Sequence, residues 1–298
     1  MLEIKKYGAI DIGSNAIRLL VSNVILYKDK EPEFKKSSLV RVPIRLGADA
    51  FVNGYISDEN IERVIDAIEA FKLLMKVHKV EKYKACATSA MREASNGNEI
   101  VKIIEEKTGV KIDIIGGKEE AAIISSTDLK ELVQSENSYL YVDVGGGSTE
   151  FTLFSNGKII TSKSFKMGTV RLLNNKKAQN KEMFSNVEKW IKKNTKNLKD
   201  VSLIGSGGNI NKLFKMSGRT EGKPISLIYL NAQYQFLKQM SYQERVSELS
   251  LNPDRADVII PATKIYLSAM KWSGARKIFV PKIGLSDGII KSLYYNKL

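Results

Sequence analysis

The stretch AIDIGSN at residues 9–15 has a second copy in the chain, YVDVGGG at residues 141–147. In each copy an apolar run ends in an aspartate, Asp11 or Asp143, and a glycine turn follows. A second apolar run after each turn predicts a hairpin. The predicted strands of the two hairpins are 7–12 with 17–25 and 139–144 with 149–154. A repeat at this distance predicts two domains of like topology.

The organisation around the two copies predicts an α/β protein with mixed sheets flanked by helices. A helix is expected over residues 119–133, and no Pro-, Gly- or Ser-rich linker separates the copies. We therefore expect a short rigid hinge between domains at 1–124 and 125–298. A C-terminal helix at about 285–298 is expected to pack back on the first domain.

Composition excludes several classes of site. The chain has 298 residues, one cysteine and one histidine, so it has no intramolecular disulfide and no Cys/His zinc cluster. A metal must then be held by oxygen ligands, which favours Mg²⁺ or another hard cation. The single His78 ends an apolar helix face and is interpreted as a core or boundary residue. Without a signal-peptide pattern or an apolar stretch long enough to span a bilayer, a cytoplasmic location is expected.

The formal net charge of +14 indicates a polyanionic partner or a surface of solvated lysines. The densest lysine block, 176–199, contains Trp190 and Ile191 and predicts one amphipathic helix. Local signals predict two further features. Asn96 and Glu99 have capping-box spacing for a helix that ends at Gly109, and Asn156 with Gly157 predicts a tight hairpin turn.

Asp11 and Asp143 are candidate cation ligands, because each lies at a strand end beside glycines that let a phosphate approach the backbone. The alternative is that both belong to ordinary hairpin turns. Glu150 begins an otherwise apolar strand, where an acid is costly unless it is exposed or bound to a cation. An exposed edge position is the alternative for Glu150.

Two glycine turns are candidate phosphate cradles. The first is Gly145-Gly146-Gly147 with the hydroxyl of Ser148. The second is Gly205-Ser206-Gly207-Gly208-Asn209, which stands between a short apolar strand and a helix, so that the helix N-terminus offers N–H groups to an anion. This second turn lacks the Lys-Ser/Thr pair of a P-loop.

Charged residues of the first half complete the candidates. Glu119 and Glu120 open a helix, where acids suit the helix dipole, and one of them could instead face a cleft as a general base. Arg18 and Arg92 stand where they could clamp a phosphate. A surface salt bridge is the alternative for either arginine.

Taken together, these segments resemble the exopolyphosphatase/guanosine pentaphosphate phosphatase family, a branch of the actin-like ATPase superfamily. The matching segments run in the family's order from near residue 9 to near residue 290. They are AIDIGSNAIRLL (9–20), RLGADAFVNGYIS (45–57), ATSAMREA (87–94), IIGGKEEAAI (114–123), YVDVGGGSTEF (141–151), KMGTVRL (166–172), IGSGGNI (204–210), RADVIIP (255–261) and GLSDGII (284–290).

The resemblance implies two ribonuclease-H-like domains facing a cleft, with terminal orthophosphate released from inorganic polyphosphate or from guanosine pentaphosphate (pppGpp). It implies that Glu120 is the general base, and that Asp143 and Glu150 bind Mg²⁺ and position the phosphate, which makes Glu150 a second catalytic residue. Asp11 is a further metal candidate. It also implies a homodimer. The implied phosphate contacts are Ser14, Asn15, Arg18, Arg92, Gly145, Gly146, Gly147, Ser148, Gly207, Gly208 and Asn209.

Two departures from the family pattern keep alternatives open. Ala122 stands where the family often has arginine, and Ala262 follows Pro261 where the family has glycine. A sugar-kinase-like or actin-like ATPase, and a non-catalytic sensor that binds phosphate chains or nucleotides, are the readings outside the family's hydrolase activity.

Overall fold

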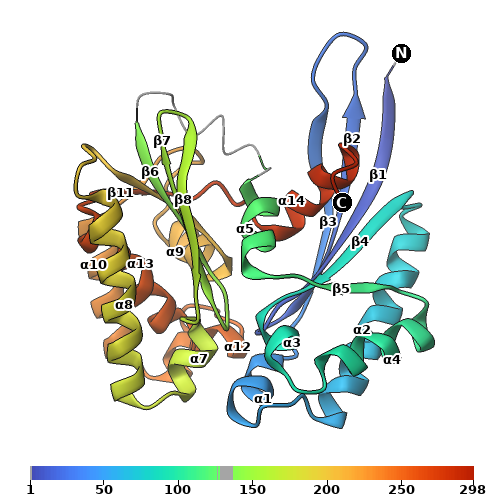
Figure 1. The fold of residues 1–298 in the computed structure, drawn as a ribbon, viewed down its shortest axis with the longest axis horizontal. Coiled ribbons are helices and arrows are strands. Elements are labelled where there is room, and N and C mark those ends of the chain that lie inside the picture. The colour runs from blue at the N-terminus through green and yellow to red at the C-terminus, as the bar shows by residue number, and fades with distance from the viewer. Residues whose placement is uncertain (1, 126, 128–136) are drawn as a thin grey trace. The chain divides into compact units, whose positions relative to one another are not determined.

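The computed structural model describes residues 2–125, 127 and 137–298. The chain divides into two compact units (Figure 1). The first unit contains residues 1–127 and 284–298, and the second contains residues 128–283. Each unit has its own sheet and its own apolar core.

The sheet of the first unit has five strands in the order β3-β2-β1-β4-β5. The β1–β2 and β2–β3 pairs are antiparallel, whereas β4 runs parallel to both β1 and β5. The strands are β1 (Glu3–Ile12), β2 (Ile17–Leu26), β3 (Glu33–Val42), β4 (Lys82–Ala87) and β5 (Ile112–Ile114).

Helices pack against both faces of this sheet. Ile10 and Ile12 of β1 share one core with α2 and α4, since alternate residues of a strand point to one face. Helix α14 packs against β1, β4 and α5 (Figure 1). The helices are α1 (Leu46–Val52), α2 (Asp58–Val77), α3 (Ser89–Glu93), α4 (Gly97–Thr108), α5 (Gly117–Ser125) and α14 (Leu285–Tyr294).

The sheet of the second unit has six strands in the order β10-β11-β9-β6-β7-β8. Parallel β11–β9 and β9–β6 pairs stand beside antiparallel β6–β7 and β7–β8 pairs. The strands are β6 (Ser138–Val144), β7 (Thr149–Ser155), β8 (Lys158–Phe165), β9 (Ser202–Ser206), β10 (Ile225–Ser226) and β11 (Lys277–Phe279). Two mixed sheets flanked by helices confirm the predicted fold class.

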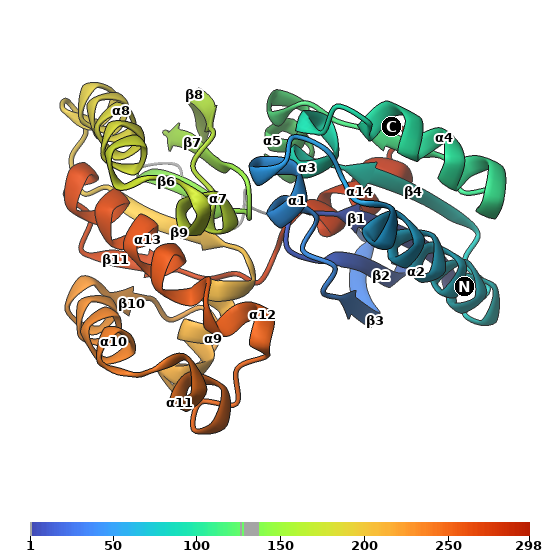
Figure 2. The same cartoon turned by 90° about the horizontal axis from the view of Figure 1, so that it is seen from below.

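Helices α8 and α13 of the second unit lie side by side (Figure 2). Val187 and Ile191 of α8 are buried, while the lysines of the same helix are exposed, which confirms the predicted amphipathic helix. The helices are α7 (Thr169–Asn174), α8 (Lys177–Thr195), α9 (Gly208–Met216), α10 (Leu227–Gln239), α11 (Tyr242–Ser247), α12 (Pro253–Ala256) and α13 (Ile259–Ser273).

Helix ends and turns were predicted with mixed success. Gly109 ends α4 with φ 71°, and Asn156-Gly157 forms the predicted turn with positive φ at both residues. The capping box at Asn96 is wrong, because the Asn96 side chain bonds the backbone of Ile56 at 2.8 and 3.0 Å. Helix α5 occupies the start of the predicted 119–133 helix, and most of the remainder lies outside the described residues.

Within residues 2–125, 127 and 137–298, none of the helices combines the length and the apolar character needed to span a bilayer.

The single cysteine yields a testable prediction. Cys86 lies on β4 with no exposed surface, and burial raises the pKa of its thiol to about 12. Because the thiolate is the reactive form, we expect a disulfide reagent at pH 8 to leave the native protein unlabelled. One thiol per chain should react in denaturant. Rapid labelling of the native protein would contradict this burial.

Candidate active site

The glycine turn between β6 and β7 sets two acids side by side. Asp143 and Glu150 are directly opposite in the β6–β7 register, so their side chains leave the same face of the sheet. The Gly145 N–H donates to the Ser148 carbonyl at 3.0 Å and closes the turn. The turn therefore presents two carboxylates beside three glycines.

Glu150 is only 2% exposed, so the alternative of an exposed edge position is wrong. Its strand, β7, lies between β6 and β8 and is not an edge. The hydroxyls of Ser148 and Ser164 both donate to Glu150 Oε1, at 2.7 and 2.8 Å. Since these donors hold one oxygen, the orientation of the carboxylate is fixed by the sheet.

The segment after β8 backs the glycine turn. The carbonyls of Gly145 and Gly146 accept bonds from the backbone of residues 169–171, and the Gly147 carbonyl accepts one from Arg171 Nε at 2.9 Å. In a trans peptide the N–H points opposite to the carbonyl before it. The amides that follow these carbonyls therefore point away from this segment, and successive backbone N–H groups of this kind suit an anion.

Gly168 makes this arrangement possible. A Cβ there would lie 2.3 Å from backbone atoms of Gly146 and Gly147. Reasoning from residue types did not single out Gly168, Arg171 or Ser164 as site residues. The segment KMGTVRL (166–172), which contains Gly168 and Arg171, was the available signal for the first two.

A second glycine turn, at residues 205–209, lies beside Asp143. Ser206 of β9 lies beside Asp143 in the parallel register, and Gly207 follows with φ 116°. A Cβ on Gly207 would lie 3.0 Å from the Val144 carbonyl and 3.5 Å from Asp143 Oδ1. The turn then opens α9, whose first residues include Gly208 and Asn209. The structure thus brings Asp143, Glu150, Gly145–Ser148 and Gly207–Asn209 together within the second unit.

Two buried tyrosines surround Asp143. Burial first, and the negative charge of Asp143 second, raise the pKa of both Tyr141 and Tyr266. The Tyr266 hydroxyl donates to the Ser206 carbonyl. Both phenols therefore stay protonated at neutral pH, and Tyr266 anchors the turn that carries Gly207.

The corresponding hairpin of the first unit holds an ion pair. Asp11 and Arg18 are opposite in the β1–β2 register, and Arg18 Nη1 lies 3.3 Å from Asp11 Oδ2. Asp11 is buried, which raises the pKa of its carboxyl, while Arg18 opposes that rise. The partner of Arg18 is thus a buried carboxylate and not a surface one.

The turn that follows Asp11 is fixed by neighbouring elements. The Ser14 carbonyl accepts the Gly47 N–H at 2.7 Å, and the Asn15 carbonyl accepts the Arg45 N–H at 3.1 Å. The Ser14 hydroxyl lies 2.9 Å from that of Ser89, the first residue of α3. The turn is therefore joined to both α1 and α3.

Helix α3 also carries Arg92, whose Nη1 donates to the Ile115 carbonyl at 2.6 Å. Ile115 follows β5, and α5 begins two residues later. Glu120 lies half-buried in the first turn of α5, and the neighbouring Glu119 is exposed. Arg92 thus ties α3 to the loop that positions Glu120. Its partner at 2.6 Å is a backbone carbonyl and not the carboxylate of a surface salt bridge.

The fold of this chain is shared with proteins of known structure. The chain superposes on an exopolyphosphatase from Cytophaga hutchinsonii with a TM-score of 0.85 at 22% identity, covering 98% of each chain. An Aquifex aeolicus member of the Ppx/GppA family gives a TM-score of 0.79 at 23% identity over 99% of each chain. Likeness at this identity shows the shared fold.

Two known proteins are similar in sequence to most of this chain. It is 32% identical over 302 residues to a bifunctional 3-dehydroquinate synthase/phosphatase of Fusobacterium nucleatum, covering 92% of this chain but only 44% of that protein. It is 24% identical over 321 residues to exopolyphosphatase 2 of Mycobacterium tuberculosis, covering 98% of this chain and 99% of that protein.

The Ppx/GppA phosphatase family model matches residues 30–297, so the chain belongs to that family and is a phosphohydrolase. This confirms the resemblance inferred from the motifs. The hairpin with Asp11, Ser14, Asn15 and Arg18 precedes the matched residues.

Proposed function

We propose that this phosphohydrolase is an exopolyphosphatase, which releases terminal orthophosphate from inorganic polyphosphate by in-line attack of water. One observation carries the proposal. Two glycine turns far apart in sequence gather around Asp143 and Glu150 in the second unit, with the Cβ position of Gly207 3.5 Å from Asp143 Oδ1. Two of the relatives, from Mycobacterium tuberculosis and Cytophaga hutchinsonii, are named exopolyphosphatases.

Backbone amides would hold most of the phosphate oxygens. The turn at Gly145–Ser148 offers the N–H groups that point away from residues 169–171, and Gly207–Asn209 offers the N-terminus of α9. The buried side-chain oxygen of Asn209 has no hydrogen-bond partner among the residues that the structure describes. An amide in that position suits contact with a ligand.

The donor set fits Mg²⁺. Asp143 and Glu150 supply carboxylate oxygens from one face of the hairpin. Mg²⁺ commonly takes one or two protein carboxylates and completes its shell with water and phosphate oxygens. Bound there, Mg²⁺ would neutralise charge shared by the last two phosphates.

The first unit supplies the remaining roles in this proposal. Glu120 accepts a proton from the attacking water, and Arg92 and Arg18 offset charge on the phosphate chain. Ser14 and Asn15 contribute further phosphate contacts. Asp11 stays a candidate metal ligand that would share its charge between Arg18 and the cation.

The deciding assay measures Mg²⁺-dependent orthophosphate release from polyphosphates of graded length, with ATP and pppGpp in parallel. We expect release from polyphosphate to exceed release from either nucleotide. Release from ATP alone would favour an ATPase. Binding of polyphosphate without release of orthophosphate from any substrate would favour a non-catalytic sensor. That alternative stays open because Ala122 stands where the family often has arginine.

Hydrolysis of pppGpp is the second candidate function, because the family model covers both types of phosphatase. It requires a pocket for the guanine base. Faster release from pppGpp than from polyphosphate in the same assay would select it.

A further inference from the structure

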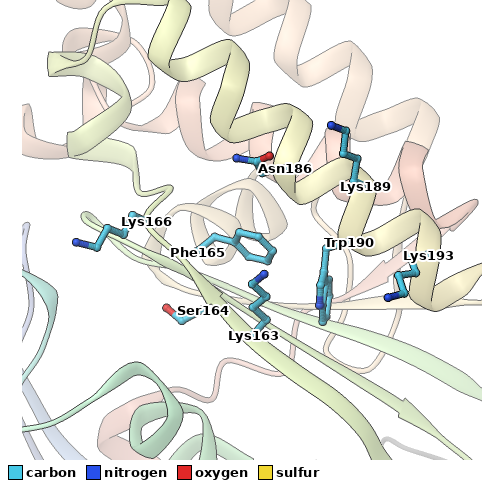
Figure 3. A pocket seen from close by; sticks show the side chains of 8 residues that line it. All are labelled: Lys163, Ser164, Phe165, Lys166, Asn186, Lys189, Trp190 and Lys193. Carbon is cyan, nitrogen blue, oxygen red and sulfur yellow. The ribbon is translucent and has the colours of Figure 1, made fainter.

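A lysine-rich surface feature adjoins β8, the edge strand of the second sheet. A pocket of about 460 Å³ opens in the second unit between the end of β8 and the face of α8 (Figure 3). Residues of both elements surround it. They are Lys163, Ser164, Phe165, Lys166, Asn186, Lys189, Trp190 and Lys193.

The pocket carries a concentrated positive charge. Four of its eight lining residues are lysines and none is acidic. Within the described residues, Lys163, Lys189 and Lys193 form no ion pair, whereas the neighbouring Lys192 pairs with Glu188 at 2.6 Å. Like charges gathered at one place repel one another, so a bound anion would relieve an unfavourable arrangement.

The aromatic wall of the pocket favours a phosphate chain over a nucleobase. The rings of Phe165 and Trp190 pack edge-on with centroids 5.9 Å apart, and Phe151 packs against both. The Lys163 ammonium lies over the Phe165 ring at 4.8 Å from its centroid. Because Lys163 covers the Phe165 ring and the three rings pack on one another, the rings act as a rigid support, and the lysines supply the charge for binding.

The pocket and the candidate active site share the edge strand β8 but use its opposite faces, because Ser164 pairs with Glu150 whereas Lys163 pairs with Phe151. Ser164 lines it and also donates its hydroxyl to Glu150 Oε1 at 2.8 Å. Lys166 lines it two residues before Gly168, whose backbone packs against the glycine turn. Because β8 is the edge of the sheet, a flexible chain of phosphates held near Glu150 would reach the lysines by passing around that edge.

From these observations we infer that the β8–α8 pocket is an accessory subsite for inorganic polyphosphate, which holds phosphates beyond those at the cleaved end. The inference rests on the proposed function and adds to it a group of residues that determines which length of polyphosphate binds best. Polyphosphate carries a charge on every unit, so each lysine can neutralise one without base-specific contacts.

The test compares two triple variants with equal loss of charge. The pocket variant is Lys163→Gln with Lys189→Gln and Lys193→Gln. The control variant replaces exposed lysines outside the pocket, Lys177→Gln with Lys181→Gln and Lys199→Gln. Binding is measured without Mg²⁺ in a Trp272→Phe background, where Trp190 is the remaining tryptophan of the two in the chain. Its fluorescence then reports occupation of the pocket.

We expect long-chain polyphosphate to bind the pocket variant roughly tenfold more weakly, since exposed charge pairs each contribute little. The slope of log affinity against log salt should fall by about 2, as three phosphate contacts on a flexible chain imply. The loss should shrink as the chain shortens, and the control variant should keep the parent affinity.

Equal losses in the two variants, or a loss independent of chain length, would overturn the subsite. Stronger binding of single-stranded RNA than of polyphosphate at Trp190 would overturn it in favour of a nucleic-acid surface. Because binding is measured without turnover, these failures are separate from a failure of the proposed function, which would show as absent orthophosphate release while length-dependent binding persists.

Discussion

Replacing Glu120 with glutamine is expected to lower polyphosphate turnover by about 10²–10⁴-fold, the usual contribution of a general base. The glutamine keeps the shape of the side chain in the first turn of α5 but cannot accept a proton from water. Binding of polyphosphate should change little, because phosphate contacts are assigned to other residues. The measurement is kcat for orthophosphate release beside an equilibrium Kd obtained without Mg²⁺.

Glu119→Gln is the matched control, because it makes the same change one position earlier in the same helical turn, at an exposed side chain. It should keep parent activity. If Glu120→Gln turns over at the parent rate, another group accepts the proton. If both variants lose activity equally, the effect belongs to the charge at the start of α5 and not to base catalysis.

Gly168→Ala is expected to reduce activity by about 100-fold, the loss that a displacement near 1 Å at a reacting centre can cause. The new Cβ would lie 2.3 Å from the backbone of Gly146 and Gly147, and backbone cannot turn aside as a flexible side chain can. The glycine turn must therefore shift away from Asp143 and Glu150. Turnover and polyphosphate affinity should both fall, and thermal unfolding should occur at lower temperature because of overpacking.

Gly157→Asn provides the control in the same pair of strands. Gly157 lies at the opposite end of the β7–β8 pair, with φ 71° and open space around it, and asparagine tolerates that conformation. This variant should keep activity and melt close to the parent. Full activity in Gly168→Ala would mean that the glycine turn does not position substrate.

The duplicated hairpin could be predicted from sequence because its signals are local. Asp11 and Asp143 each occupy the penultimate position of a strand, and each faces a charged residue on the returning strand, Arg18 or Glu150. An apolar run, an acid and a glycine turn determine that arrangement within about fifteen residues. The parallel neighbour of each aspartate, Cys86 or Ser206, comes from a strand remote in sequence.

The features that could not be predicted from the sequence depend on contacts between residues that are far apart in the chain. Asn96 has the right spacing for a cap, but its amide is taken by the backbone of Ile56 forty residues away. Ser164 looks like any strand serine until the register places it opposite Glu150. The burial of Glu150 likewise follows from β8 covering its strand, which the hairpin alone does not reveal.

The last helix of the chain has a consequence for biosynthesis. Helix α14 belongs to the first unit, where Gly288 lies so close to the Ile123 carbonyl that a Cβ would approach it to 2.3 Å. The ribosome makes the whole second unit between α5 and α14. Residues 128–283 can thus fold as one uninterrupted segment, while β1 and β4 wait through that synthesis with one apolar face uncovered. The first unit is begun before the second and completed after it, so its incomplete form is a stage exposed to chaperones and to aggregation.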